Sequence, residues 1–191
     1  MLEEFSINYY NSGLKYIKEK NFEIAIEHLL KSIAFNKTNI YSWNLLGLCF
    51  LKQGKIKMAE YCWKQSISNN CKDNVAFLYL EKLNNKIENV ENSFRNVLKI
   101  CKNKKYKKAI KIFEKEILSI LSNTISVQNL YGVLKFLNKD KTGSRKIWVN
   151  ALKEDISNIE VINYLSCLNE ARKNKYIEYL KKIFTLCGEK E

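Results

Sequence analysis

The sequence predicts an all-α protein assembled from pairs of helices, and three observations support this. The 191 residues include no Pro and only six Gly, whereas turn-rich β folds need both residue types. Apolar residues recur at helical spacing, as in Ile26, Leu29, Leu30 and Ile33. Matching residues also recur with a fixed period over the range 6–73, which indicates a repeated structural unit.

The composition is typical of a folded, globular chain. Hydrophobic residues make up 46% and charged residues 28% of the sequence, and the length suffices for one medium-sized domain. The start, MLEEFSINYY, is acidic where a signal peptide would be basic, and no segment approaches the roughly 18 apolar residues of a membrane span. We therefore expect a cytoplasmic protein with no membrane span. The abundance of Asn, Lys and Ile is typical of a low-GC bacterial genome.

The repeat period, which equals the spacing from Gly13 to Gly47, defines two units over about residues 6–73. Each unit reads as a helix, a short polar connection and a second helix, with connections at 18–21 (KEKN) and 52–55 (KQGK) that suit an antiparallel hairpin. The matching pairs are Tyr9 with Trp43, Gly13 with Gly47, Tyr16 with Phe50, Ala25 with Ala59, Leu29 with Trp63, and Ser32 with Ser66.

This pattern resembles the tetratricopeptide repeat, most strongly over residues 6–73. The resemblance implies pairs of antiparallel helices that stack into a right-handed α-solenoid. It also implies that Gly13 and Gly47 lie where the two helices of a unit cross, with Ala25 and Ala59 as the small residues facing them. Close packing there would offset the cost of Gly inside a helix, which is about 1 kcal/mol relative to Ala.

The second half of the chain matches the pattern less well. Ala109 and Phe113 resemble the second helix of a third unit, and Gly132 with Trp148 resembles a fourth. Between them and the first two units, the segment 75–83 (VAFLYLEKL) reads as an added helix. An alternative interpretation pairs a helix over 75–84 with one over 87–102, and the sequence does not choose between the two.

The expected architecture is therefore a right-handed α-solenoid of tetratricopeptide-like helix pairs, with an extra helix near 75–84 and closing C-terminal helices. We expect a single domain over 1–191 with an irregular junction near 73–90. Its predicted parts are repeats at about 6–39, 40–73, 90–123 and 125–158, an inserted helix at 74–86, and C-terminal capping helices over 159–187.

Nothing in the sequence is typical of an enzyme, and we expect no cofactor or metal. His28 is the single histidine, and the glycines form no phosphate-binding loop. Acids such as Glu114 and Glu116 lie among lysines on a predicted helix, where solvated ion pairs are expected. No Cys-x-x-Cys motif is present, so the six cysteines are expected to be reduced thiols in apolar helix faces: Cys49, Cys62, Cys71, Cys101, Cys167 and Cys187.

The resemblance also implies a binding surface. In tetratricopeptide proteins the first helices of successive units line a concave groove that usually binds peptide segments or partner helices. This favours a non-enzymatic adaptor with a protein or peptide partner, in which Asn44 would anchor backbone amides. Alternatively, the chain's own N-terminal segment or a neighbouring helix covers the same surface. The candidate groove residues are Tyr10, Leu14, Ile17, Tyr41, Asn44 and Leu48, with Ile7 and Leu51 beside them.

A second candidate site is basic. The net charge is +13, and the densest stretch, 99–111, has seven lysines and no acid. It indicates an acidic protein partner, nucleic acid or an anionic membrane, although a solvated turn also accounts for it. Arg is scarce, and Tyr106 is the single aromatic residue in this stretch, so binding of nucleic acid is less favoured than binding of an acidic protein. A nucleic-acid-associated or regulatory protein is therefore kept as the alternative function. Self-association is a third possibility. The candidate basic patch is Lys102, Lys104, Lys105, Lys107 and Lys108.

Overall fold

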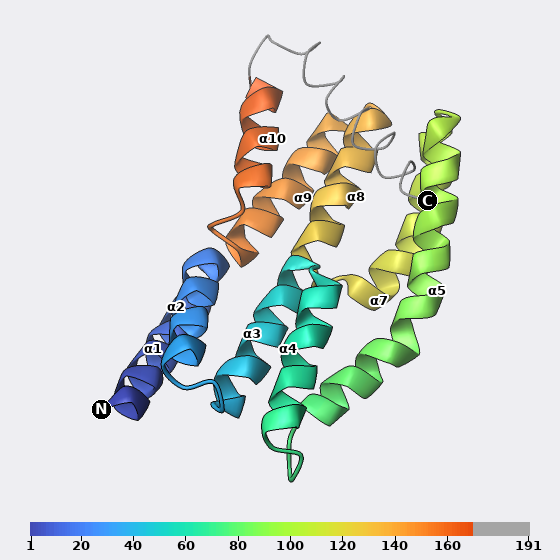
Figure 1. The fold of residues 1–191 in the computed structure, drawn as a ribbon. Helices are drawn as coiled ribbons and strands as arrows, with labels where there is room; N and C mark the ends of the chain where they lie inside the picture. The colour runs from blue at the N-terminus through green and yellow to red at the C-terminus, as the bar shows by residue number, and fades with distance from the viewer. Residues whose placement is uncertain (170–191) are drawn as a thin grey trace. The chain divides into compact units, whose positions relative to one another are not determined.

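The computed structural model describes residues 1–169, apart from the side chains of residues 86–88 and 169 (Figure 1). Every regular element in this part of the chain is a helix, which confirms the predicted all-α class. The helices are α1 Leu2–Lys18, α2 Phe22–Phe35, α3 Ile40–Gln53, α4 Ile56–Asn69, α5 Ala76–Lys102, α6 Tyr106–Ile112, a π-helical segment Phe113–Leu118, α7 Ser119–Leu121, α8 Ile125–Leu137, α9 Lys141–Glu154 and α10 Ile159–Asn169.

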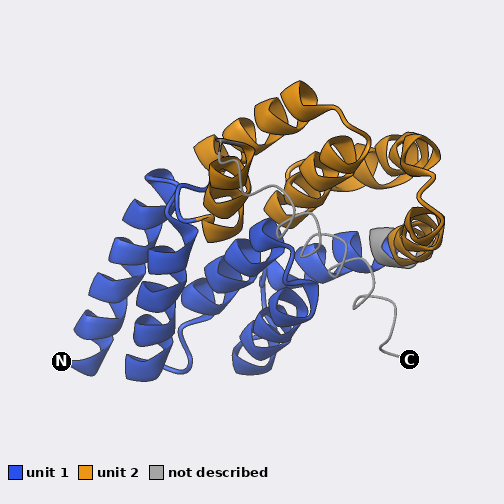
Figure 2. Ribbon diagram, turned by 90° about the horizontal axis from the view of Figure 1, so that it is seen from above, with its two compact units in different colours: residues 1–85, 155–157 blue, residues 86–154, 158–191 orange. Residues whose placement is uncertain are grey.

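The chain divides into two compact units (Figure 2). Unit 1 consists of Met1–Asn85 together with Asp155–Ser157, and unit 2 consists of Lys86–Glu154 and the residues from Asn158 onward. The boundary between them falls inside α5. The single domain of the sequence analysis, with its repeat bounds, stays a prediction.

In unit 1, helices that follow one another in sequence pack against one another. α1 packs on α2, α2 on α3, and α3 on α4. Leu29, Leu46 and Trp63 are almost completely buried in the core between them. This is the packing expected of consecutive helical hairpins, each of which buries an apolar face that it cannot cover alone.

Four turns inside helix pairs share one backbone geometry. Each contains a residue with positive φ: Lys20 (58°), Gly54 (82°), Lys104 (56°) and Lys139 (67°). At each turn this residue donates its N–H to the carbonyl three positions earlier, and the next residue donates to the carbonyl five positions earlier. These bonds satisfy carbonyls at the end of the first helix, as in a Schellman motif. The conformation favours Gly, yet three of the four positions hold Lys.

Two pairs of helices cross closely at a Gly that faces a Trp. A Cβ atom added to Gly47 would lie 2.7 Å from Cδ1 of Trp63, and one added to Gly132 would lie 2.5 Å from Cδ1 of Trp148. Neither position has room for a side chain. In both pairs the Gly lies on the first helix, α3 or α8, and the Trp lies on the second, α4 or α9.

Gly13 makes the equivalent crossing in the first pair, where an added Cβ would lie 2.9 Å from Cδ2 of Leu29. The close crossing was predicted, with Ala25 facing Gly13, and the Ala25 backbone oxygen does lie 3.5 Å from the added Cβ. The Leu29 side chain, which was not predicted, lies closer. Side chains on a helix lean toward its N-terminus, so the residue one turn after Ala25 covers the glycine. Trp63, one turn after Ala59, likewise provides the atoms nearest to Gly47.

The segment after residue 75 differs from both interpretations of the sequence. A separate helix near 75–84 was expected before a further helix, whereas α5 continues without interruption for 27 residues. The residues at 84–89, NNKIEN, include no Gly or Pro. They therefore lack the two residue types that interrupt a helix most strongly, and the two expected helices are one.

Unit 2 has its own core between the end of α5 and α10. Phe113 and Ile117, both in the π-helical segment, are fully buried together with Trp148 and Val161. α8 packs on α9 and α9 on α10. α10 begins at 159, as expected for the first closing helix, and the part of the predicted capping region beyond residue 169 lies outside the described residues.

Candidate partner-binding surfaces

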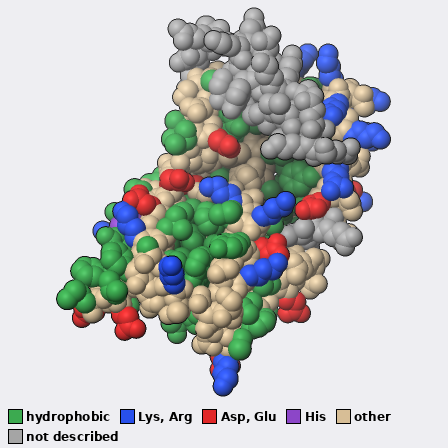
Figure 3. Space-filling model, viewed as in Figure 1, with side chains coloured by type: hydrophobic (Ala, Val, Ile, Leu, Met, Phe, Trp, Pro, Cys, Tyr) green, Lys and Arg blue, Asp and Glu red, His purple; other side chains and the backbone are tan. Residues whose placement is uncertain are grey.

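The first candidate surface is a row of exposed apolar side chains in unit 1. The row begins with Ile7 in α1, which is 54% exposed. Tyr41 in α3 is 67% exposed, and Val75, just before α5, is 50% exposed. Each follows the previous one by exactly one repeat period. The three residues therefore occupy the same place in three successive repeats, all within unit 1. Figure 3 shows hydrophobic side chains gathered over the helices of unit 1, at the lower left and centre of that view.

Contacts between neighbouring helices join this row. The rings of Tyr10 and Tyr41 lie with their centroids 6.4 Å apart, which brings α1 and α3 together on this face. Burial raises the pKa of the Tyr10 phenol, and the neighbouring Tyr41 adds to the increase. Asn44 in α3 then donates to Oδ1 of Asn74, the residue immediately before Val75, at 3.1 Å. The row is therefore joined directly between α1 and α3, whereas α3 and the chain before Val75 are joined by buried amides.

The six predicted groove residues differ in how far their side chains are exposed to solvent. Tyr41 is exposed, whereas Tyr10, Leu14, Ile17 and Leu48 are half-buried. These five lie on α1 and α3, the helices from which the prediction drew them. We define the apolar row as Ile7, Tyr10, Tyr41, Val75 and Leu78.

Asn44 does not have the predicted role. It is only 8% exposed, and its amide nitrogen is bonded to Asn74 rather than open to a partner. Trp63 donates its indole N–H to the backbone carbonyl of Asn44 at 3.2 Å, so both groups of this residue belong to the packing of the unit. The resemblance to the repeat family predicted that Asn44 lies in the groove. The bond to Asn74, which precedes the next repeat, instead holds the Asn44 side chain in the interior.

The predicted basic patch lies in unit 2. All five lysines are exposed. Lys104, Lys105, Lys107 and Lys108 line an open pocket of 470 Å³, together with three residues that the prediction did not include, Tyr106, Lys111 and Asn138. Lys102 is not part of the lining. We call this set of seven lining residues the lysine pocket.

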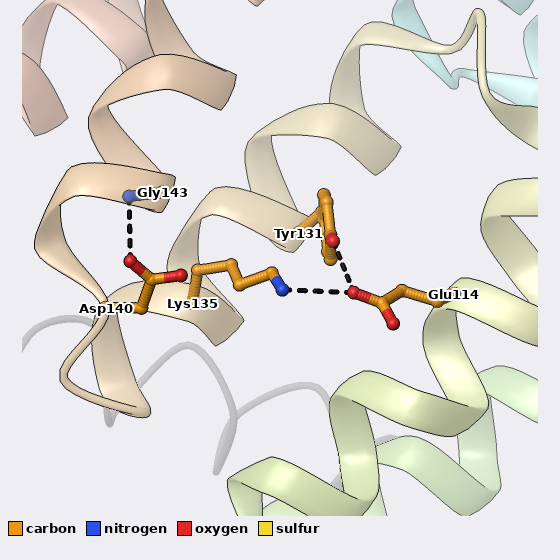
Figure 4. A network of polar contacts seen from close by, with 5 residues as sticks. All are labelled: Glu114, Tyr131, Lys135, Asp140 and Gly143. Atoms are coloured by element: carbon orange, nitrogen blue, oxygen red, sulfur yellow. Dashed lines mark hydrogen bonds and ion pairs between the residues drawn. The ribbon is translucent and has the colours of Figure 1, made fainter.

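A polar cluster holds α8 to the π-helical segment of unit 2 (Figure 4). Tyr131 donates its hydroxyl to Glu114 at 2.5 Å, and the Lys135 ammonium lies 3.0 Å from the same oxygen. These partners hold the pKa of Glu114 below its usual range, with the Tyr131 hydrogen bond as the largest cause. Glu116 accepts from Ser93 at 2.8 Å. The two acids expected to be solvated pairs thus bind side chains of other helices.

The remaining reactive side chains are mostly packed. Burial raises the pKa of Cys49 and Cys62 to about 12 and that of Cys101 to about 11, whereas Cys71 is exposed. Cys187 lies outside the described residues. His28 is half-buried between aromatic rings, with Tyr16 at 5.0 Å and Tyr9 at 5.7 Å between centroids. Within residues 1–169 no three His, Cys, Asp or Glu side chains are arranged to hold a metal ion.

The predicted sites omitted five residues of these surfaces: Val75, Leu78, Tyr106, Lys111 and Asn138. Val75 and Leu78 follow Tyr41 and Asn44 by one period, a signal that the expected extra helix obscured. Lys111 ends the lysine-rich stretch that the prediction had noted. Asn138 comes from the turn after α8, and no feature of the sequence predicts that it reaches the lysine pocket.

Comparison with known proteins gives only distant similarity. No protein-family model matches the chain, and no characterised protein matches it in sequence. Two solved structures resemble the fold over the whole of both chains: MamA 41-end from Desulfovibrio magneticus RS-1, at 14% identity and a TM-score of 0.37, and the MamA RS-1 ArsTM double mutant, at 12% identity and a TM-score of 0.37. Among the described residues, no helix is long and apolar enough to cross a membrane.

Proposed function

We propose that this protein is a non-enzymatic adaptor of the tetratricopeptide type, which binds a segment of a partner protein on the apolar row of unit 1. The observation that carries the proposal is the repetition of exposed Ile7, Tyr41 and Val75 at one position of three successive units. Single exposed apolar residues are ordinary on protein surfaces. A row of them at a fixed period forms a larger apolar surface, which is costly to leave in water and favours a bound partner.

The geometry of the row supports a particular kind of segment. Side chains of α1 and α3 meet on this face, where the Tyr10 and Tyr41 ring centroids are 6.4 Å apart, so we expect successive anchors to be separated by one helix spacing, on the order of 10 Å. Seven residues of an α-helix span about 10 Å, and three residues of an extended chain span about the same length. We expect the partner to present large apolar side chains either seven apart on a helix or three apart on an extended segment, two established modes of peptide recognition.

Tyr10 and Tyr41 are the strongest anchors in this proposal. Aromatic residues supply a large contact area for a small loss of side-chain freedom, and Tyr is enriched at positions that dominate binding energy. Tyr10 is already half-buried against Tyr41, so little ordering remains when a partner binds. The cytoplasmic location and the low-GC bacterial origin stay predictions.

Site-specific photo-crosslinking tests the proposal. A photoreactive aromatic residue is placed at Tyr41 on the row, and in a second variant at Tyr61 on α4, a tyrosine that is also exposed, at 52% against 67%. After irradiation in lysate of the native host, we expect one protein crosslinked from position 41 and not from position 61. The apolar row is excluded as the binding surface if both positions capture the same set of proteins.

Purified partner then allows a quantitative comparison. The double variant Tyr10→Ala/Tyr41→Ala should weaken binding at least about tenfold, a loss typical of residues that dominate an interface. Tyr61→Ala serves as the matched control and should leave the affinity unchanged. If the crosslinked species is a second copy of the chain, the row is a self-association surface and the adaptor function is wrong.

A further inference from the structure

The lysine pocket of unit 2 is distinguished by how its charges are distributed. Five of its seven lining residues are lysines, and the other two, Tyr106 and Asn138, are uncharged and polar. No carboxylate of the described residues lines it. None of the five ammonium groups forms an ion pair within the part of the chain that the structure describes. In Figure 3, Lys and Arg side chains gather at the upper right, around the end of α5.

Five neighbouring lysines with no acid among them favour the binding of an anion. Like charges within a few ångström repel one another, and the repulsion is reduced only by solvent and salt. Some lysines elsewhere in the chain are paired on their own helices, as Lys31 is with Glu27 and Lys64 with Glu60. The stretch 104–111 contains no acid that plays this role. The pocket therefore carries a local positive charge that its own lining residues do not neutralise, as expected for a site that binds an anion.

The size of the pocket selects among anions. A volume of 470 Å³ corresponds to a cube with edges of about 8 Å, within the range of small-molecule sites. An extended peptide with five acidic residues spans about 17 Å, so two or three of its carboxylates would lie in the pocket and the others outside its open side. A phosphoryl group carries up to about two negative charges, compared with one for a carboxylate. A short chain of phosphoryl groups is thus the ligand that best balances five lysines in this space.

The residue types are consistent with this ligand. A Lys ammonium is a compact charge on a flexible stem, with three donors that adapt to phosphate oxygens. The Tyr106 hydroxyl and the Asn138 amide add donors that do not depend on charge. We propose that the lysine pocket binds a compact oligophosphate, either an inorganic chain or the phosphate chain of a nucleotide. This inference does not depend on the proposed function of unit 1.

Calorimetric titration with inorganic triphosphate tests the proposal, with sulfate at matched ionic strength as the reference anion. We expect one triphosphate bound per chain, more tightly than sulfate. The variant Lys104→Gln/Lys107→Gln/Lys108→Gln should bind at least about tenfold more weakly, because three of five local charges are removed. The control Lys18→Gln/Lys57→Gln/Lys72→Gln loses the same charge from exposed lysines of unit 1 and should change affinity by less than about twofold.

A pair of glycine variants separates binding from folding. Lys104 and Lys20 have the same positive-φ turn conformation, which Gly adopts more easily. Both Lys104→Gly and Lys20→Gly should therefore raise the melting temperature of the unliganded protein by a few degrees. Only Lys104→Gly should weaken triphosphate binding, because Lys20 is not in the pocket lining.

Competing ligands complete the experiment. Equal affinities for triphosphate and ATP indicate that the phosphate chain alone is bound, whereas tighter binding of ATP indicates a nucleotide, and both support the proposal. Tighter binding of an oligoglutamate peptide, or of single-stranded RNA without a terminal triphosphate, overturns it in favour of an acidic protein or a nucleic acid. Equal weakening in the two triple variants, or no binding of triphosphate, also overturns it.

Discussion

The Gly47–Trp63 crossing of unit 1 and the Gly132–Trp148 crossing of unit 2 come from different halves of the chain and are built alike. In each, the glycine allows the helices to approach, and the Trp fills the space. In each, the indole N–H donates to the backbone carbonyl of an asparagine one turn before the glycine, at 3.2 Å to Asn44 and 3.1 Å to Asn129. The unit with clear repeats and the more divergent unit therefore depend on the same contact.

The two crossings differ in the asparagine that accepts from the Trp. In unit 2, Asn129 and Asn158 each donate to the other's side-chain oxygen, at 3.2 and 3.1 Å, and Asn129 also donates to Glu160. In unit 1, Asn44 donates to Asn74, but its own side-chain oxygen is buried without a hydrogen-bond partner. The comparison teaches that the packing of the Trp is shared, whereas the polar connection to the next helix is built separately in each unit.

The largest expected effect comes from filling the shared crossing. Gly47→Ala and Gly132→Ala should each lower the free energy of unfolding by about 2 kcal/mol. Overpacking costs about 1–3 kcal/mol and the strained indole hydrogen bond about 1 kcal/mol, while Ala regains about 1 kcal/mol inside a helix. Urea unfolding followed by circular dichroism measures the change.

Gly13→Ala is the matched control, because Leu29 can rotate away more easily than a buried indole ring. It should change stability by less than about 1 kcal/mol, since the gain in helix propensity offsets mild crowding. If Gly47→Ala stabilises the protein as Ala does at an exposed helical site, the close crossing of α3 and α4 is contradicted.

A smaller effect should separate the two asparagines. Asn129→Leu leaves the buried Asn158 amide without its reciprocal partner, which should cost about 1–3 kcal/mol. Asn44→Leu should cost less than about 1 kcal/mol, because it removes an oxygen that is already unpartnered. Asn74 would keep its other bonds, to Ser66 at 2.9 Å and from the N–H of Ala76 at 3.0 Å. Equal losses in thermal unfolding would show that the polar connections of the two units are equivalent after all.

The smallest effect is a pH dependence of unit 2. The folded pKa of Glu114 is lowered, so the native state binds fewer protons than the unfolded state near that pH. The stabilisation is complete above the unfolded pKa and is lost as the pH falls through the lowered folded value. Because the Glu114 side chain is 41% exposed, we expect the free energy of unfolding to change by less than about 1 kcal/mol over this pH range.

Unfolding free energies measured from neutral to acidic pH test this expectation. Glu114→Gln should remove part of the pH dependence. The control Glu3→Gln removes an exposed carboxylate of α1 in unit 1, and its pH profile should match that of the unmodified protein. Identical profiles for all three proteins would mean that the Tyr131–Glu114–Lys135 cluster does not contribute to stability.

The helix pairs could be predicted because their signals are local and repeated. The matches between Gly13 and Gly47 and between Leu29 and Trp63 identify residues that touch within one unit. The continuity of α5 could not be predicted in this way, because a repeat period suggests where helices should restart, whereas local composition decides whether they stop. Over 84–89 there is no Gly or Pro, but three of the six residues are Asn, a weak helix former, so neither composition nor period predicted the continuous helix.

The candidate sites were predictable to the extent that one helix defines them. Tyr10 and Tyr41 were expected from the resemblance to the tetratricopeptide repeat, and the lysine-rich turn is visible in the sequence. The burial of Asn44 and the position of Asn138 depend on contacts with distant parts of the sequence, which no local pattern encodes. The two candidate surfaces stay predictions, and one of the residues assigned to them, Asn44, lies in the interior.

Within unit 1, the bonds that residues 155–157 make to the turn between α1 and α2 have a consequence for how the chain folds during synthesis. Ile156 donates its N–H to the carbonyl of Lys20 at 3.0 Å, and Glu23 donates to the Ser157 hydroxyl at 3.2 Å. Repeat proteins fold mainly through neighbours in sequence, because distant contacts require closure of a long loop. On the ribosome, α1 and α2 can pair early and close the turn between them with its own backbone bonds. The two bonds from residues 156 and 157 form only after more than a hundred further residues have been translated, so this turn gains its last contacts late.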